Sequence, residues 1–284
     1  MDEPYLAGPD TYALPTHIPI PGLGNLLVNA FVVQSQEPVL IDTGLGTDTA
    51  EFIDALESIV PLSQLKWIWL THDDADHTGS IQRVLELAPQ ARLATHGMAA
   101  LRMGSWFPIP LDRVHALQFD DALHVGDRTL RALRPPTFDN PMSIGVFDES
   151  NGTLFSVDSF GAVLPEITQD AFDIPMDDLT QGMVAWGTFD APWMHVVDLN
   201  RFEAVLDGVR RLDPARVLSS HLPAASGHLD HFLDVLRSLR DAEPAIPPDH
   251  EAFAQLAAII QGTAVMALPG GSDAGSRAAR PAQG

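Results

Sequence analysis

The chain has 284 residues and no cysteine, and its 38 acidic residues outnumber 16 basic ones, which gives a formal charge of -22. This length fits one large domain or two small ones, and it can bury a core without disulfides. Without cysteine, thiolate metal sites and iron–sulfur clusters are excluded, and histidine and carboxylates remain as ligands. The negative charge disfavours a nucleic-acid partner, because such binding relies on lysine and arginine to neutralise phosphates.

The two ends of the chain indicate where the protein resides and how it is divided. The N-terminal MDEPYLAGPD lacks the pattern of a signal peptide, and no apolar run reaches the roughly 18 residues of a membrane helix. We therefore expect a cytoplasmic protein without a membrane partner. We also expect one domain over residues 1–268 and a disordered tail over 269–284, because that tail is small, polar and rich in glycine and alanine.

The first part of the chain predicts alternating strands and helices. Apolar runs predict strands over 26–34, 39–42, 66–70 and 92–95. Asp48 and Glu51 fit a capping box, which predicts a helix through Val60, and helical spacing predicts further helices after residue 78 and up to Met103.

The later part of the chain is first strand-rich and then helical. Strands are predicted over 115–119, 122–125, 129–133, 143–147, 153–157 and 216–220, and helices over 202–212 and 229–239. This order of elements suits two sheets packed face to face with helices outside them.

The strongest chemical signal is the segment His72-Asp73-Asp74-Ala75-Asp76-His77, which directly follows the predicted strand 66–70. A tight loop at a strand end can bring these imidazoles and carboxylates onto metal, and both donor types suit divalent zinc, iron or manganese. An acid before a helix is a common cap, which would account for Asp76 alone. It does not account for the complete set.

Two later residues stand in equivalent places. Asp158 follows the strand Leu154–Val157, and His221 follows Leu218–Ser220. A single polar residue at a strand end is usually an ordinary hydrogen-bonded group, but three strands that each end in a metal-capable residue predict one shared site.

Together with Ile41-Asp42-Thr43-Gly44, these segments resemble the metallo-β-lactamase superfamily over roughly residues 27 to 225. Asp74, where that superfamily usually has a second histidine, and the run Leu154–Gly161 are similar to the di-iron domain of flavodiiron and oxygen-binding di-iron proteins. The resemblance implies an α/β fold of the αββα sandwich type, with two mixed sheets, helices on both outer faces and the metals at one edge.

The resemblance also implies the site residues. It implies one metal held by Asp76, His77, Asp158 and His221, and a second held by His72, Asp74 and the shared Asp158. We expect Asp42 to orient the metal loop from behind the ligands, as such partners commonly do.

The chain departs from this family at one place. The family has a histidine in the region that corresponds to residues 135–141, where this chain has none. Asp139 is the nearest ligand-type side chain and is our tentative replacement. His195 is an outside candidate, and a site with one ligand missing is the remaining possibility.

Three functions remain open from the sequence. The first is a non-haem di-iron oxidoreductase or binder of dioxygen or nitric oxide, with two metal ions, iron favoured over zinc or manganese, and a separate electron-transfer protein as its partner. The second is a hydrolase of a small ester, thioester or lactone, in which Asp76 would be catalytic by helping to hold a metal-bound hydroxide. The third is a non-catalytic sensor with a degenerate site. The resemblance leaves a homodimer open.

Overall fold

The computed structural model describes residues 1–247 and 249–260, and the chain divides into two units after Ala245. The first unit, Met1–Ala245, contains both sheets, and the described part of the second contains helix α8 (His250–Ile260). The tail predicted over 269–284 lies outside the described residues. Each helix in the described ranges is too short or too polar to cross a membrane.

The first sheet of this unit is mixed and has eight strands. Its order is β1-β2-β3-β4-β5-β6-β7, with β12 paired to β3. The pairs from β1 to β4 are antiparallel, and those from β4 to β7 are parallel. The strands are β1 (Tyr5–Gly8), β2 (Thr11–Ile20), β3 (Gly24–Val33), β4 (Val39–Ile41), β5 (Trp67–Trp69), β6 (Arg92–His96), β7 (Val114–Leu117) and β12 (Val163–Leu164).

The second sheet is also mixed and has five strands in the order β13-β11-β10-β9-β8. Only the β11–β13 pair is parallel among these strands. The strands are β8 (Ala122–His124), β9 (Thr129–Leu133), β10 (Gly145–Asp148), β11 (Thr153–Phe155) and β13 (Arg216–Leu218).

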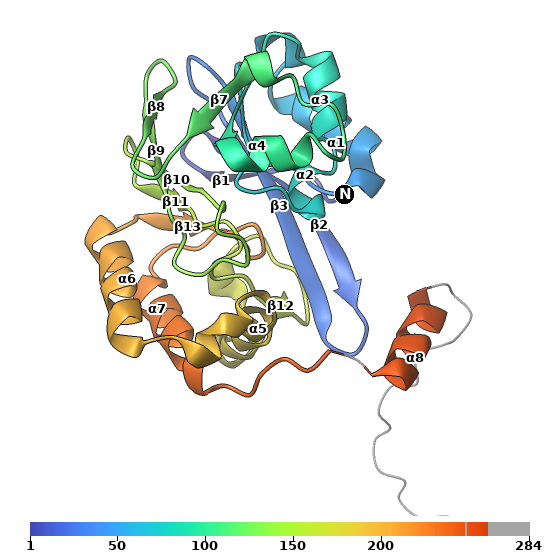
Figure 1. The fold of residues 1–284 in the computed structure, drawn as a ribbon, viewed down its shortest axis with the longest axis vertical. Helices are drawn as coiled ribbons and strands as arrows, with labels where there is room; N and C mark the ends of the chain where they lie inside the picture. Colours follow the sequence, from blue (N-terminus) through green and yellow to red (C-terminus); the bar gives the residue numbers. More distant parts are fainter. Residues whose placement is uncertain (248, 261–284) are drawn as a thin grey trace, which may run out of the picture. The chain divides into compact units, whose positions relative to one another are not determined.

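Helices cover the outer face of each sheet (Figure 1). Those against the first sheet are α1 (Thr49–Ile59), α3 (Ile81–Leu87) and α4 (Gly97–Met103), and those against the second are α5 (Met176–Asp190), α6 (Leu199–Leu212) and α7 (Leu229–Ser238). The short α2 (Ala75–Thr78) follows β5 and overlaps the segment 72–77, which we call the metal loop because the sequence predicts metal ligands there. Six 3-10 turns complete the described elements: Gly46–Asp48, Leu62–Gln64, Leu111–Arg113, Ala171–Asp173, Pro192–Val196 and Leu239–Asp241.

The core follows from the alternation of side chains along the strands. On β3, Phe31 and Val33 join a buried cluster that contains residues of both sheets, whereas Ala30 and Val32 face the helices α1, α3 and α4. Successive side chains of a strand point to opposite faces, so a fully apolar strand can serve two cores at once. The result is helices, sheet, sheet, helices, which confirms the predicted αββα sandwich.

The sequence prediction was incomplete in its local detail. It omitted β1, β2, β12, α5 and α8. The predicted capping box is wrong, because Asp48 makes no side-chain cap of α1. Its carboxylate instead accepts a hydrogen bond of 2.8 Å from the Thr16 hydroxyl on β2, a strand that the prediction did not include.

Candidate metal centre

The candidate ligands meet at one edge of the sandwich, where strands of both sheets end. His72 and Asp74 follow β5 of the first sheet, and His77 lies on α2. Asp158 follows β11, and His221 follows β13, which are neighbouring parallel strands of the second sheet. Their parallel register places both side chains at the same sheet edge. The loop after β5 faces them from the other sheet.

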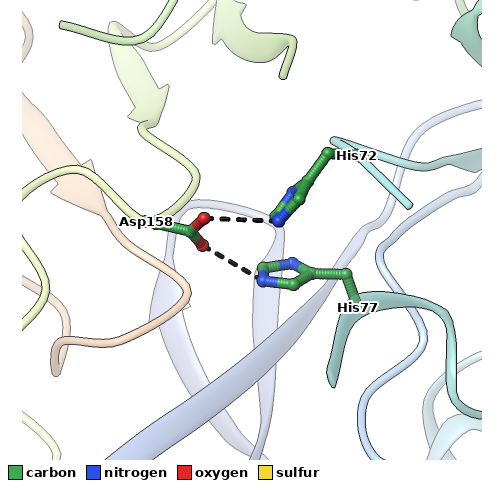
Figure 2. Close-up of side chains that lie close together, drawn as sticks. All are labelled: His72, His77 and Asp158. Atoms are coloured by element: carbon green, nitrogen blue, oxygen red, sulfur yellow. Dashed lines mark ion pairs between the residues drawn. The ribbon is translucent and has the colours of Figure 1, made fainter. Parts of the chain in front are cut away.

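Asp158 lies at the middle of the cluster. Its Oδ1 is 3.1 Å from Nε2 of His77 and 3.1 Å from Nε2 of His221, and its Oδ2 is 3.3 Å from Nε2 of His72. Figure 2 shows the imidazoles of His72 and His77 directed at opposite oxygens of this carboxylate. One carboxylate therefore faces two separate groups of nitrogen donors.

These two groups define the two sides of the centre. Asp76, His77 and His221, around Asp158 Oδ1, form the histidine side. His72, Asp74 and Asp139 form the carboxylate side, where each residue offers a ligand atom within 4.8 Å of the others. All the ligands that the sequence predicts are thus brought into one cluster, Asp139 included.

The residues fit a metal rather than a hydrogen-bonded network. Asp158 is 4% exposed, yet no hydrogen bond of acceptable geometry reaches its Oδ1. A buried carboxylate oxygen without a partner is costly, unless a cation takes that place. Two donor atoms that bind one metal at about 2.1 Å lie roughly 3–3.5 Å apart, which matches the separations of His77 and His221 from Oδ1.

The far nitrogens on the histidine side are fixed by hydrogen bonds. Nδ1 of His77 lies 2.8 Å from Oδ2 of Asp42, and Nδ1 of His221 lies 2.7 Å from the carbonyl oxygen of Leu27. Asp42 also accepts bonds of 2.8 Å from the amide and the hydroxyl of Thr71. Bonds of this kind set the ring orientation and leave Nε2 free to face the centre.

The loop that carries Asp158 holds a strained backbone. Val157 has a φ of +59°, which is a genuine outlier for a β-branched residue. Its carbonyl accepts bonds from the Ser219 hydroxyl at 3.1 Å and from the Ser220 amide at 2.9 Å. The residues just before Asp158 and just before His221 therefore hold each other in place, and the strain is maintained at the site it positions.

The electrostatics of the histidine side favour protonated imidazoles and ionised carboxylates. Burial would lower the pKa of His77 and His221, but the facing carboxylates of Asp76 and Asp158 raise both above 6.5. Burial would raise the pKa of Asp158 and Asp76, but the imidazoles hold both below 3.8. Positive charge is thus favoured between these imidazoles and carboxylates, and a bound cation would replace the imidazole protons.

The carboxylate side is more open. The Asp74 side chain is 41% exposed, and Asp139 is exposed in a loop with Pro135, Pro136 and Pro141. Burial, partly offset by His72, raises the pKa of Asp139 to about 6.

A charged clamp next to this side holds the metal loop. Asp73, which is buried, forms two charge-assisted hydrogen bonds with Arg102 on α4 and accepts a third, of 3.0 Å, from Asn140. The sequence prediction assigned no role to these three residues, because their contacts join segments that lie far apart in the sequence. The clamp ties the metal loop to the loop that carries Asp139.

Two further residues of α5, which the sequence did not single out, lie at the centre. Trp186 donates from Nε1 to the carbonyl oxygen of Asp158 at 3.0 Å, and its ring lies 4.4 Å from that of His221. Asp190 offers a carboxylate oxygen within 4.8 Å of those of Asp139 and Asp158. Burial, followed by the charge of Asp158, raises the pKa of Asp190 to about 8.

His195 does not belong to this cluster. It lies in the 3-10 turn Pro192–Val196, where its Nε2 is buried. The metal-capable groups found among the described residues leave it out. Among the described residues, the geometry therefore gives no support to His195 as the replacement ligand.

A hollow in the surface leads to the exposed side of the metal loop. Asp74 and Asp76 line it together with Trp106 and Phe107. Trp106 is 60% exposed, so this ring is available to a molecule that enters the hollow.

The sandwich and the cluster at its edge define a domain of the metallo-β-lactamase fold. The chain belongs to the family described as ODP family beta lactamase, whose family model matches residues 26–221. The resemblance seen in the sequence is thereby confirmed.

Proteins with flavin and di-iron names are similar to this chain. A putative diflavin flavoprotein of Nostoc sp. (strain PCC 7120) is 26% identical over 205 residues, which cover 72% of this chain and 35% of that protein. A flavo-diiron protein of Clostridium acetobutylicum is 25% identical over 134 residues, which cover 47% and 34%. The chain thus spans about a third of the length of these curated relatives.

A solved structure supports the same fold. The rubredoxin oxygen:oxidoreductase of Desulfovibrio gigas superposes with a TM-score of 0.72 at 16% identity, over 84% of this chain and 61% of that one.

Proposed function

We propose that this domain is a non-haem di-iron oxidoreductase domain that binds and reduces a diatomic gas, dioxygen or nitric oxide. The observation that carries the proposal is the position of Asp158, a buried carboxylate whose two oxygens face two separate groups of ligand-type side chains. Such a carboxylate suits two metals bridged by one ligand. The names of the relatives, flavo-diiron protein and rubredoxin oxygen:oxidoreductase, support the reaction class.

Iron is the metal that the donor set favours. His72 on the carboxylate side is accompanied by Asp74 and Asp139, so that side offers one nitrogen and otherwise oxygen. Carboxylate oxygens are hard donors that suit iron or manganese better than they suit zinc, and they stabilise a higher oxidation state.

Each residue of the chain then has a defined task. His77, His221 and Asp76 would hold one iron, His72 and Asp74 the other, and Asp158 would bridge them. When bound there, iron would supply the redox chemistry needed to reduce a small molecule. A separate electron-transfer protein remains the expected source of those electrons.

A metal-dependent hydrolase is the second candidate, and the comparisons do not favour it. The same histidine side could hold zinc with a bound hydroxide, positioned by Asp76. A non-catalytic sensor would keep the ligands but would not turn over.

A single-turnover experiment separates these functions without the electron donor. The purified chain is loaded with Fe(II) under anaerobic conditions, its iron is quantified per chain, and it is mixed with buffer that contains dioxygen or nitric oxide. We expect two irons per chain and a visible absorption change that is lost in His77→Ala. A chain that takes up only zinc, stays colourless and cleaves thioesters or lactones would overturn the proposal in favour of the hydrolase.

A further inference from the structure

One face of α5 lies over the metal centre. Gly182, Trp186 and Asp190 recur at intervals of four residues, and residues spaced in this way share one face of a helix. A Cβ on Gly182 would lie 2.4 Å from the carbonyl oxygen of Val163, so only glycine lets the helix run this close to β12. Close approach at Gly182 brings the two following members of the face toward Asp158.

Contacts one turn later show that this face reaches the ligands. Trp186 donates its hydrogen bond to the carbonyl oxygen of Asp158 and packs on the ring of His221. A Cβ on Gly161 would lie 2.6 Å from the Trp186 ring and 2.8 Å from Cβ of His221. Gly161 therefore leaves the space that the indole occupies, and Asp190, one turn further on, is directed at the same centre.

The end of α5 is also tied to the loop that carries Asp139. Trp193, in the turn that follows the helix, donates from Nε1 to the carbonyl oxygen of Phe138 at 2.8 Å, and the two rings lie 5.4 Å apart. The residues next to Asp139 and those just after Asp190 are thus joined. This contact holds together the two segments that carry Asp139 and Asp190.

The resulting group of Asp139, Asp158 and Asp190 is electrostatically unfavourable by itself. Three carboxylate oxygens lie within 4.8 Å of one another. Asp190 also stands at the C-terminal end of a helix, where the helix dipole disfavours an anion. Within the described ranges, no lysine or arginine comes within 4.0 Å of these three carboxylates.

The same group includes Asp158, which is 4% exposed and whose Oδ1 has no hydrogen bond of acceptable geometry. Oδ1 faces the histidine side and Oδ2 faces His72, so Asp139 and Asp190 bring their oxygens to a carboxylate that already borders the carboxylate side. We propose that Asp190 is a ligand of the metal on the carboxylate side, where together with Asp139 it supplies the oxygen donors that stand in for the absent histidine. This proposal rests on the two-metal centre of the proposed function.

The proposal has a consequence for metal choice. His72 would be the single nitrogen donor of that metal, among the carboxylates of Asp74, Asp139, Asp158 and Asp190. Such a site favours iron or manganese over zinc, because hard oxygen donors suit those ions. The histidine side, which has two imidazoles, keeps its affinity for zinc.

The test compares Asp190→Asn with Asp177→Asn, a change of the same charge at the exposed start of the same helix. Each metal-free protein is titrated with Fe(II) alone and with Zn(II) alone, and bound metal is counted per chain by elemental analysis. We expect two Fe(II) in the native chain and in Asp177→Asn, but one in Asp190→Asn. Asp190→His, which returns a nitrogen donor, should raise bound Zn(II) from one to two.

The other possible results separate the role of Asp190 from the proposed function. Two Fe(II) bound by Asp190→Asn with the native affinity would overturn the role of Asp190 and leave the proposed function intact. Fewer than two Fe(II) in the native chain would overturn the proposed function itself. Circular dichroism of the metal-free proteins checks folding. If Asp190→Asn does not fold, Asp190→His decides instead, since unchanged zinc binding in that variant would reject the proposal.

Discussion

The histidine side and the carboxylate side of the centre differ in how exposed their residues are, although His72 on the carboxylate side is also buried. On the histidine side, His77 and His221 are each 1% exposed, and the far nitrogen of each ring has a fixed partner within 2.8 Å. On the carboxylate side, Asp74 is 41% exposed and Asp139 lies in a loop. Asp158, between them, is held by a strained and hydrogen-bonded backbone.

This difference predicts that the two sides differ in metal affinity and in access to solvent. Preorganised ligands lose little freedom when metal binds, so the histidine side is expected to hold its ion tightly. Exposed carboxylates must be ordered at the time of binding, so the carboxylate side is expected to bind more weakly and to be the side that small molecules and solvent reach.

The largest effect is expected from removal of an imidazole on the histidine side. His77→Ala or His221→Ala should remove bound metal and leave the fold largely intact, because the core rests on apolar strands elsewhere. Elemental analysis and circular dichroism check both statements. His124→Ala, at an exposed histidine on β8, is the control. Unchanged metal content in both site variants would show that the ligands are assigned wrongly.

A selective effect is expected on the carboxylate side. Asp139→Asn should lower the occupancy of one metal and leave the ion at Asp76, His77 and His221 in place, because Asp139 groups with His72 and not with those three. Asp139→His should restore two ions per chain. Loss of both ions from Asp139→Asn would mean that the two sides do not bind independently.

A smaller effect is expected when the support of His77 is altered. Asp42→Asn keeps the size of the side chain but removes the charge that accepts bonds from His77 and Thr71. Outer partners of this kind typically contribute about 10–100-fold to metal affinity. We therefore expect a metal titration to show weaker binding by that factor on the histidine side only. Equal weakening on both sides would show that Asp42 stabilises the loop as a whole and does not act through His77.

As pH rises from 5 to 8, the stability of the metal-free protein should fall while its affinity for metal rises. The raised pKa values of His77 and His221 give the metal-free fold stability that is complete below 6.5 and is lost as pH rises through the folded-state values. The lowered pKa of Asp158 gives stability above 3.8 that is lost on acidification. Metal binding must displace the imidazole protons, so affinity should rise with pH. Thermal melts and metal titrations from pH 5 to 8 would contradict this reading if both quantities changed in the same direction.

Much of the centre could be predicted because its signal is local in sequence. The segment after β5 places four of the predicted ligands within six residues, and Asp158 and His221 each follow a short apolar strand. The sandwich followed from the order of strand-rich and helical segments. These features need no knowledge of tertiary packing.

The rest depends on contacts that the sequence does not display. β2 contains Pro15 and Pro19, which obscure a strand that nevertheless pairs with β3 over ten residues. The buried face of α5 uses glycine where it meets the backbone of β12, so it lacks the large apolar stripe of a typical helix. Because α5 was not predicted, Asp190 was missed. The acidic residues after Pro175, at the start of α5, are the signal that could have revealed it.

The central claim is that one buried carboxylate joins two metals held in different ways. Anomalous X-ray diffraction at the iron edge, from crystals grown anaerobically with Fe(II), tests it most directly. We predict two iron peaks on opposite sides of Asp158, the stronger at about 2.1 Å from Nε2 of His77 and His221 and the weaker at that distance from His72 and Asp74. A single peak, or two peaks that share no Asp158 ligand, would contradict the account.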